Sequence, residues 1–395
     1  MRKEYFQEIR KRLLDRLDLS NELTDEEILE AIDSLILNEM RDMSCGLKEK
    51  VQLRQELFYS VRKLDVLQEL IEDESVTEIM VNGPDAVFVE REGRLSRWSK
   101  AFTSREKLED VIQQIVGKCN RVVNESMPIV DARLEGGARV NAVVYPVALN
   151  GPILTIRRFP DTPMSMERLI AIGSLTAECA EFLGKLVKAR YSIIIGGGTG
   201  SGKTTFLGAL SHYIPEDERV ITIEDNAELK LQGIPNLVRL EAKSANIEGG
   251  VSVTIRDLIK AALRMRPDRI IVGEVRGGEA VDMLQALNTG HDGSLGTAHA
   301  NSSRDMLSRL ETMTLMGVEL PLEAIRRQIA SGVDILIHLG RMRDKSRKVL
   351  EIAEVCSFEN GEIRLQTLYT WQEEKGLVQT APLLHREKLK RAGIE

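Results

Sequence analysis

The sequence predicts an α/β protein in which a large C-terminal domain built on a parallel sheet follows a smaller α+β domain and a helical N-terminal extension. Beyond residue 168, short apolar runs alternate with helical stretches, a pattern typical of a parallel sheet. Between residues 61 and 159, short β-rich runs are separated by Gly and Asn, which indicates hairpins. Before residue 61, apolar residues recur at helical spacing.

The first 60 residues predict helices in two stretches. At the start of the second stretch, Thr24 followed by Glu27 forms a capping box. We interpret the segment as a helical extension packed on its own domain, with a specialised docking arm as the alternative. Its apolar positions are Phe6, Ile9, Leu13 and Leu17, followed by Ile28, Ile32, Leu35 and Ile36.

Residues 61–159 form the predicted α+β domain, and the boundary after them is marked by composition. Residues 160–168 contain two prolines and little apolar content, so we interpret them as a linker. The larger domain then covers residues 169–371 and ends in a hairpin predicted from Val349–Val355 and Ile363–Leu365. Residues 372–395 are set apart as a charged C-terminal tail.

The composition argues against a dedicated nucleic-acid binder and against a secreted protein. The net charge is −7 and aromatic residues make up 4% of the chain, whereas a nucleic-acid channel needs basic and aromatic surface. The four cysteines include no CxxC pair, so we expect a reducing cytoplasm and no zinc. The chain opens with a charged segment, and no run reaches the roughly 18 apolar residues that span a bilayer. We therefore expect a cytoplasmic protein that reaches a membrane only through partners.

A glycine-rich segment follows the apolar run at 192–195 and fits the phosphate-binding pattern GxxxxGK[ST] at every fixed position. Glycines let consecutive backbone N–H groups turn toward a phosphate, and a helix beginning near Lys203 adds its positive end. Lys203 would reach the β and γ phosphates of ATP, and Thr204 would ligate Mg²⁺. The ATP-binding candidates are Gly198, Thr199, Gly200, Ser201, Gly202, Lys203, Thr204 and Thr205.

Three later apolar runs end in groups suited to phosphoryl chemistry. Because the carboxyl ends of parallel strands meet at one edge of a sheet, we expect these groups to lie near the phosphate-binding loop. The run at 220–223 ends in Glu224, with Glu228 shortly after it. The next run ends in Glu274 and the third ends in His299.

The two acids near residue 224 compete for one role. Glu228 is our first choice to orient or deprotonate the attacking water, and Glu224 is its rival. Glu274 would hold the Mg²⁺ shell together with Thr204. Its strand departs from the usual Walker B pattern, in which an Asp ends the strand, because here Gly273 precedes Glu274.

Histidines and arginines complete the candidate groups. His299 would sense the γ-phosphate, while a structural role is the plainer reading for it and for His291. Glu274 has a plainer reading too, as a salt-bridge partner. A guanidinium stabilises charge that develops during phosphoryl transfer, although a surface salt bridge is the simpler role for any single arginine. The candidates are Arg139, Arg157 and Arg158 in the smaller domain and Arg239, Arg264, Arg266, Arg269 and Arg276 in the larger one.

Four motifs together resemble a known family. They are GGTGSGKTT, ITIEDNAEL, LRMRPDRIIVGEVRGGEA and TGHDGSLGTAHAN, and the similarity extends to VTEIMVNGPDAVFVE, GARVNAV and ILTIRRF. This combination resembles the secretion and type IV pilus assembly ATPases of the GspE-like family, and within them the CpaF-like ATPase of Tad (Flp) pili. The late tetracysteine zinc motif of many extension ATPases is missing here, which favours the Tad, type IV secretion and archaellum-like branch.

The resemblance implies an architecture and residue roles. It implies a hexameric ring whose subunits pair a PAS-like N-terminal domain with a RecA-like ATPase domain, with ATP between them. It makes Glu228 the catalytic glutamate, Glu274 the Walker B acid and His299 the His-box residue. It also places Arg139 and either Arg157 or Arg158 at the phosphates.

The resemblance also implies a function. We expect an ATP-hydrolysing motor in which ATP draws the two domains together, driving Tad pilus assembly or secretion through inner-membrane platform proteins. A conjugation-type type IV secretion ATPase is the alternative within the family. A RecA-like nucleic-acid motor and a nucleotide-gated scaffold without useful turnover are the alternatives outside it.

Overall fold

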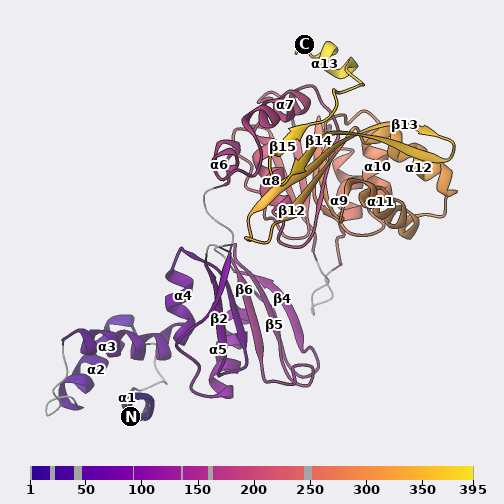
Figure 1. Ribbon diagram of the computed structural model, residues 1–395. Helices are drawn as coiled ribbons and strands as arrows, with labels where there is room; N and C mark the ends of the chain where they lie inside the picture. Colours follow the sequence, from indigo (N-terminus) through magenta and orange to yellow (C-terminus); the bar gives the residue numbers. More distant parts are fainter. Residues whose placement is uncertain are drawn as a thin grey trace. The chain divides into compact units, whose positions relative to one another are not determined.

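The computed structural model describes residues 2–17, 23–39, 47–91, 93–134, 137–158, 163–243 and 251–394. The chain divides into two compact units, Met1–Pro160 and Asp161–Glu395 (Figure 1). The α/β fold class with a parallel sheet is confirmed. Part of the predicted linker, residues 160–162, lies outside the described residues. Within the described ranges, no helix combines the length and apolar content that crossing a bilayer requires.

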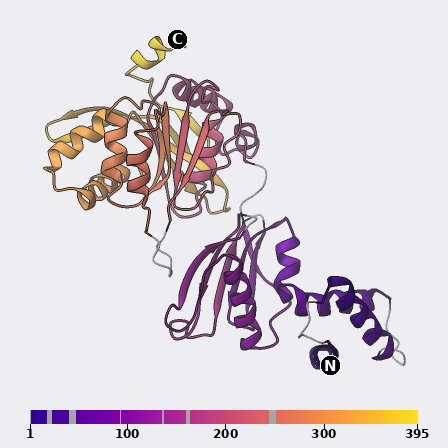
Figure 2. The same ribbon diagram turned by 180° about the vertical axis from the view of Figure 1, so that it is seen from behind.

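The first unit begins with three helices, α1 (Arg2–Arg16), α2 (Asp25–Glu39) and α3 (Leu47–Arg62). They share a small apolar cluster that includes Ile9, Ile32 and Leu57, and they lie beside the sheet of the same unit (Figure 2). The predicted capping box is formed, because the Glu27 carboxylate accepts the backbone N–H of Thr24 at 2.8 Å and Thr24 Oγ1 accepts that of Glu27 at 3.3 Å.

Polar contacts join these helices to the rest of the unit. Lys100 Nζ lies 2.9 Å from Glu56 Oε1, and Lys107 Nζ donates to the carbonyl of Ser60 at 2.8 Å. The short helices η1 (Asp65–Leu67) and α4 (Gln68–Glu72) then lead into the sheet.

The sheet of the first unit has six strands in the order β3-β2-β1-β6-β5-β4, and all its pairs are antiparallel. Strand residues alternate between faces, so Ile79, Val140 and Ile156 enter a core with α5 (Arg105–Lys118) while their neighbours face away from it. The strands are β1 (Val76–Asn82), β2 (Val87–Arg91), β3 (Arg94–Arg97), β4 (Ile129–Arg133), β5 (Arg139–Val143) and β6 (Ile153–Arg157).

The second unit is built on a nine-stranded sheet in the order β15-β14-β13-β12-β7-β11-β10-β8-β9. The six strands from β12 to β9 run parallel, and the strands from β12 to β15 pair as antiparallel neighbours. The parallel strands are β7 (Ile193–Gly197), β8 (Val220–Glu224), β9 (Leu237–Glu241), β10 (Arg269–Val275), β11 (Leu295–His299) and β12 (Ile335–Arg341).

Helices cover both faces of this sheet, which is why its central strands are apolar throughout (Figure 1). Ile193 and Ile195 of β7 face one core, and Ile194 between them faces the other. The first core is closed by α6 (Met166–Ala171), α7 (Ala177–Lys188) and α8 (Lys203–Ser211). The second is closed by α9 (Ile255–Ala262), α10 (Ala280–Asn288), α11 (Ser303–Gly317) and α12 (Leu322–Gly332).

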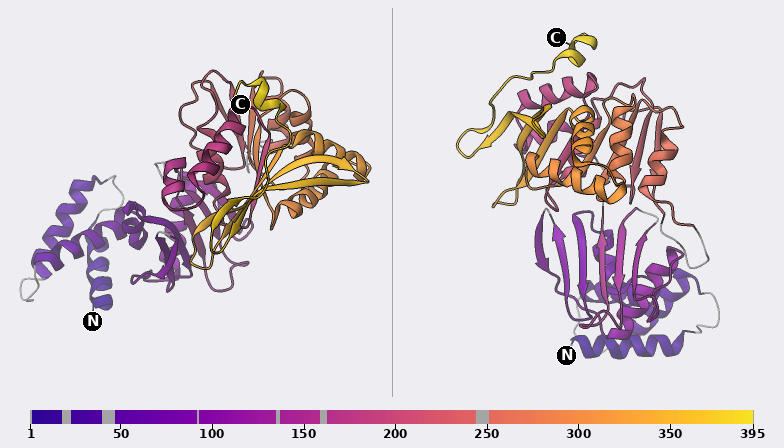
Figure 3. Two further views of the ribbon diagram at one scale, coloured as in Figure 1. Left: turned by 45° about the horizontal axis from the view of Figure 1, so that its top comes forward. Right: turned by 90° about the vertical axis from the view of Figure 1, so that its right-hand side faces the viewer.

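The C-terminal hairpin is longer than the sequence predicts. It pairs β13 (Arg347–Glu359) with β14 (Glu362–Gln372) and is the long pair of strands in Figure 3. Residues set apart as a tail form β15 (Gly376–Gln379) and the short helix α13 (Glu387–Arg391). Lys388 of α13 reaches Asp334 Oδ2 at 2.7 Å, an anchor that the local sequence of the tail does not reveal.

Candidate active site

The glycine-rich loop joins β7 to α8 at the carboxyl edge of the parallel strands. Gly200 has a φ of 71° and Gly202 a φ of 93°, values in the left-handed region that side chains with a Cβ rarely adopt. The predicted ATP-binding positions of the glycine-rich segment, 198–205, lie in this loop and the first turn of α8. Its local backbone therefore has the form that the pattern predicts, an N-terminal helix end preceded by a glycine turn.

The side chain of Lys203 folds back onto this loop. Its Nζ donates to the carbonyls of Gly197 and Gly198, both at 3.1 Å, and lies 3.4 Å from Nδ1 of His299. The residue is 8% exposed, and burial lowers the pKa of the amine. An ammonium held there by carbonyl oxygens is a cation placed to exchange them for phosphate oxygens.

Glu274 near the end of β10 lies between two other charged side chains. Its Oε1 is 2.6 Å from Nε2 of His299, at a hydrogen-bond distance but without hydrogen-bond alignment. Its Oε2 accepts from Arg276 at 2.5 Å, and Arg276 also lies 3.4 Å from Asp225. Burial and then the neighbouring Lys203 lower the pKa of His299.

Glu224 at the end of β8 is 3% exposed, and its carboxyl contacts the backbone of the loop that follows this strand. Its Oε1 accepts the backbone N–H groups of Glu228 at 3.0 Å and Leu229 at 2.9 Å, while its Oε2 is buried without a partner among the described residues. Burial raises the pKa of this carboxyl to about 7. Glu228 itself is half-buried.

The unusual glycine before Glu274 is explained by the same carboxyl. A Cβ added at Gly273 would lie 2.8 Å from Cγ of Glu224, which is closer than two carbon atoms that are not bonded to each other approach in proteins. The Gly273-Glu274 pair therefore leaves room for Glu224 on the neighbouring strand β8, and a larger residue at position 273 would displace it.

The structure thus brings Lys203, Glu274 and His299 together at one edge of the sheet and places Glu224 on the neighbouring strand. Residues 61–379 match the family described as Type II/IV secretion system protein. The chain belongs to this family. The matched range takes in the whole of the site described above.

Relatives of this secretion-system protein carry related descriptions. It is 37% identical over 326 residues to a putative conjugal transfer protein of Mycobacterium tuberculosis. The aligned region covers 81% of this chain and 91% of that protein. It is 34% identical over 303 residues to the type IV secretion system protein VirB11 of Brucella suis. The aligned region covers 70% of this chain and 84% of that protein.

Solved structures share the fold of this secretion-system protein. The pilus retraction motor PilT with bound ADP has a TM-score of 0.53 at 19% identity, with 83% of this chain and 86% of PilT covered. The ATPase DotB of Legionella pneumophila has a TM-score of 0.51 at 21% identity, with 74% of this chain and 80% of DotB covered.

The candidate arginines of the first unit are not equivalent. Arg139 of β5 and Arg157 of β6 lie directly opposite each other in the strand register, so they share the face of the sheet that looks away from the core. Arg158 is the next residue, and its Nη1 donates to the carbonyl of Asp73 at 2.5 Å. This contact gives Arg158 a structural role that sequence reasoning could not separate from a phosphate-binding one.

Two other predicted candidates lie away from the loop. Arg269 at the start of β10 is fully buried and pairs with Glu218 at the opposite, amino edge of the sheet. His291 precedes β11 at that edge, with its Nδ1 3.2 Å from the carbonyl of Ala286. Both positions fit the structural reading of these residues.

Sequence reasoning missed Arg347 at the start of β13. Its Nε donates to the carbonyl of Gly200, in the middle of the glycine-rich loop, at 3.0 Å. The two residues are 147 positions apart, and no motif marks this arginine in the sequence.

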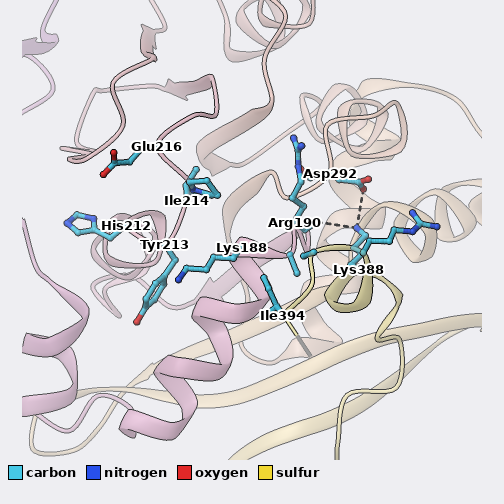
Figure 4. A pocket seen from close by; sticks show the side chains of 13 residues that line it. Lys188, Arg190, His212, Tyr213, Ile214, Glu216, Asp292, Lys388 and Ile394 are labelled. Carbon is cyan, nitrogen blue, oxygen red and sulfur yellow. Dashed lines mark hydrogen bonds and ion pairs between the residues drawn. The ribbon is translucent and has the colours of Figure 1, made fainter.

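A cleft of about 710 Å³ (Figure 4) is lined in part by residues 188–190, which precede β7, so it lies at the amino edge of the strands. The ends of α7 and α8 and the helix α13 border it, with Lys188, Tyr213 and Lys388 among the residues that line it. Lys388 is held there by Asp292 and by the carbonyl of Arg190. None of the predicted site residues lines this cleft, so we do not assign the nucleotide to it.

Proposed function

We propose that the protein hydrolyses ATP at the glycine-rich loop and uses the energy to drive a secretion or pilus machine. The observation that carries this proposal is the position of Glu274, beside His299 and Arg276 and on the strand edge that holds Lys203. An acid, an imidazole and two cations around one phosphate-binding loop form the charge arrangement that phosphoryl transfer needs.

The loop residues and a metal ion would bind the triphosphate. Gly198–Thr205 supply backbone donors and the Lys203 amine, and Thr204 with Glu274 would hold Mg²⁺. The local fit is supported by the left-handed glycines and by the Ser201 hydroxyl, which is buried without a partner among the described residues. The ion would neutralise charge that develops on the phosphate oxygens.

Glu228 is the acid that we assign to the attacking water. The carboxylate of Glu224 is almost fully buried, and one of its oxygens is taken up by two backbone donors. Its raised pKa alone would suit a base, but its burial and its two backbone contacts favour a role in shaping the loop. The backbone of Glu228 is held by its hydrogen bond to Glu224. The side chain of Glu228 is more exposed than that of Glu224.

Nucleotide binding and turnover test this assignment directly. We expect calorimetry on the full chain to show magnesium-dependent binding of ATP and a phosphate-release assay to show turnover. Lys203→Ala should abolish turnover, because its ammonium is the cation that we assign to the β and γ phosphates. Arg327→Ala, which removes an exposed ion pair with Glu323 on α12, is the matched control. Undiminished turnover by Lys203→Ala would remove the central assignment.

Two machines fit this activity. The four motifs resemble those of CpaF-like ATPases, which favours Tad pilus assembly. The names of the relatives in Mycobacterium tuberculosis and Brucella suis favour a conjugation-type type IV secretion role. Deletion of the gene followed by counting of surface pili and measurement of DNA or protein transfer separates the two. Complementation with Lys203→Ala shows whether the affected process needs ATP hydrolysis.

We further propose that six copies form the working ring and act on inner-membrane platform proteins. The support is the resemblance of the motifs to those of ring-forming motors, together with the family membership. Solution mass measured with and without an ATP analogue tests the ring. A chain that stays monomeric at every nucleotide and protein concentration while hydrolysing ATP would contradict it.

A further inference from the structure

Arg347 contacts the glycine-rich loop from outside the motif. It begins β13, and its Nε donates to the carbonyl of Gly200 at 3.0 Å. The aliphatic part of its side chain also lies against the loop, because a Cβ added at Gly202 would be 3.3 Å from Cδ of Arg347. A charge-assisted hydrogen bond and a packing contact thus act on two residues of one short loop.

This contact fixes the orientation of one peptide group. In a trans peptide, the carbonyl of Gly200 and the N–H of Ser201 point in opposite directions. The carbonyl faces Arg347, so the N–H points away from the arginine, where it donates to the carbonyl of Gly198 at 3.3 Å. Lys203 donates to that same carbonyl. The N–H of Ser201 and the amine of Lys203 are therefore on the inner side of the loop, where both can exchange a carbonyl for a phosphate.

Hydrogen bonds hold the backbone of Arg347 and of the residues that follow it. Its backbone carbonyl accepts from the hydroxyl of Ser174 at 2.8 Å, and Ser174 is 4% exposed. The backbone N–H of Val349 donates to the carbonyl of Ser174 at 2.9 Å. Lys348 Nζ donates to the carbonyl of Gly173 at 2.6 Å. The start of β13 is thus held by the turn between α6 and α7, and the guanidinium extends from a fixed backbone.

We propose that Arg347 is a positioning residue for the nucleotide, which holds the 200–201 peptide so that its N–H faces the phosphates. The proposal rests on the proposed function, because it concerns the same loop. A phosphate can enter on the inner side without breaking the contact on the outer side. Arg347 therefore acts on the affinity of the loop and not on the chemical step.

The test compares Arg347→Ala and Arg347→Lys with wild type in the full chain. For Arg347→Ala we expect the Kd for magnesium-ADP and the KM for ATP to rise about fivefold, since the charge-assisted hydrogen bond that is lost is exposed to solvent. We expect kcat to stay within about twofold, because uniform binding is lost and not transition-state stabilisation. Arg347→Lys keeps a donor on a long stem and should restore part of the affinity.

Arg364→Ala on β14 is the matched control, since Arg364 is exposed and 3.8 Å from Glu359. It should leave the Kd and KM unchanged. If Arg347→Ala also lowers the melting temperature, the partial rescue by Arg347→Lys decides the question.

Several results would overturn the inference. They are an unchanged Kd in Arg347→Ala, a fall in kcat at constant KM, or no rescue by lysine in a folded protein. A wild type that binds no magnesium nucleotide would instead remove the proposed function, and this inference with it. Wild-type binding with an unaffected Arg347→Ala removes the inference alone.

Discussion

The carboxylate of Glu224 accepts the backbone N–H of Glu228 at 3.0 Å, which ties the buried acid at the end of β8 to the half-buried acid four residues later. The same oxygen accepts from Leu229 at 2.9 Å. One acid thus sets the backbone from which the other projects. This relationship assigns different roles to two residues that look interchangeable in the sequence.

Substitution of the two acids should separate these roles. Glu228→Gln should lower kcat about 100-fold or more while ATP still binds, because a general base contributes that much. Glu224→Gln keeps an oxygen for both backbone donors, so its loss should stay below about tenfold. Glu224→Ala leaves those donors unsatisfied and should cost far more. Phosphate release and calorimetric ATP binding provide the measurements. Equal losses in the two Gln variants would contradict the separation of roles, and a larger loss in Glu224→Gln would make Glu224 the catalytic acid.

The raised pKa of Glu224 predicts a pH-dependent stability. Burial raises its pKa to about 7, above the ordinary value of 4.5. Below pH 4.5 the carboxyl is protonated whether the chain is folded or unfolded. As the pH rises toward 7 the unfolded chain loses the proton more readily, so the folded state loses stability, by about 3 kcal/mol once the pH exceeds 7. Glu224→Gln cannot ionise and should lack this loss.

Urea unfolding of wild type and Glu224→Gln between pH 5 and pH 8 measures the effect. A Trp98→Phe background leaves Trp371 of β14 as the single tryptophan, which reports on the second unit. The stability of the Gln variant relative to wild type should increase with pH. A constant difference across this range would show that Glu224 ionises normally in the folded protein.

Local features made much of this fold and site predictable. The glycine-rich loop is a property of consecutive backbone positions, so the pattern at 197–204 was enough to predict its form. Glu274 and His299 could be placed together because parallel strands end at a common edge. The first prediction needs only a short stretch of sequence, and the second needs one rule of sheet architecture.

Burial and long-range contacts could not be predicted in this way. Glu224 and Glu228 differ in exposure and backbone partners, which depend on the path of their loop. Arg347 reaches Gly200, and Lys388 reaches Asp334, through strands and helices that only the assembled sheet brings together. No spacing in the sequence encodes such distant pairs.

The arginines of the first unit give a third prediction. Arg139→Ala and Arg157→Ala should each lower ATP turnover about a thousandfold or more if their shared face supplies a guanidinium to the phosphates. Arg158→Ala should instead lower the melting temperature, because its contact with the carbonyl of Asp73 is lost. Phosphate release and thermal melts of the three variants distinguish these outcomes. Normal turnover in both Arg139→Ala and Arg157→Ala would show that neither acts on the nucleotide.

Arg269 gives the last prediction, which concerns stability at the edge of the sheet opposite the site. It is fully buried, its guanidinium pairs with Glu218, and it also donates to the carbonyls of Val187 and Gly293. Arg269→Met should destabilise the second unit by about 3–5 kcal/mol, because Glu218 is left buried without its partner.

A second variant tests that reason. Adding Glu218→Gln to Arg269→Met removes the unpaired charge, so the double variant should regain part of the stability. Arg364→Ala, at an exposed ion pair with Glu359, should change stability by less than about 1 kcal/mol. Urea unfolding followed by Trp371 fluorescence measures all three. If Arg269→Met proves as stable as wild type, the buried pair contributes little to the stability of the second unit.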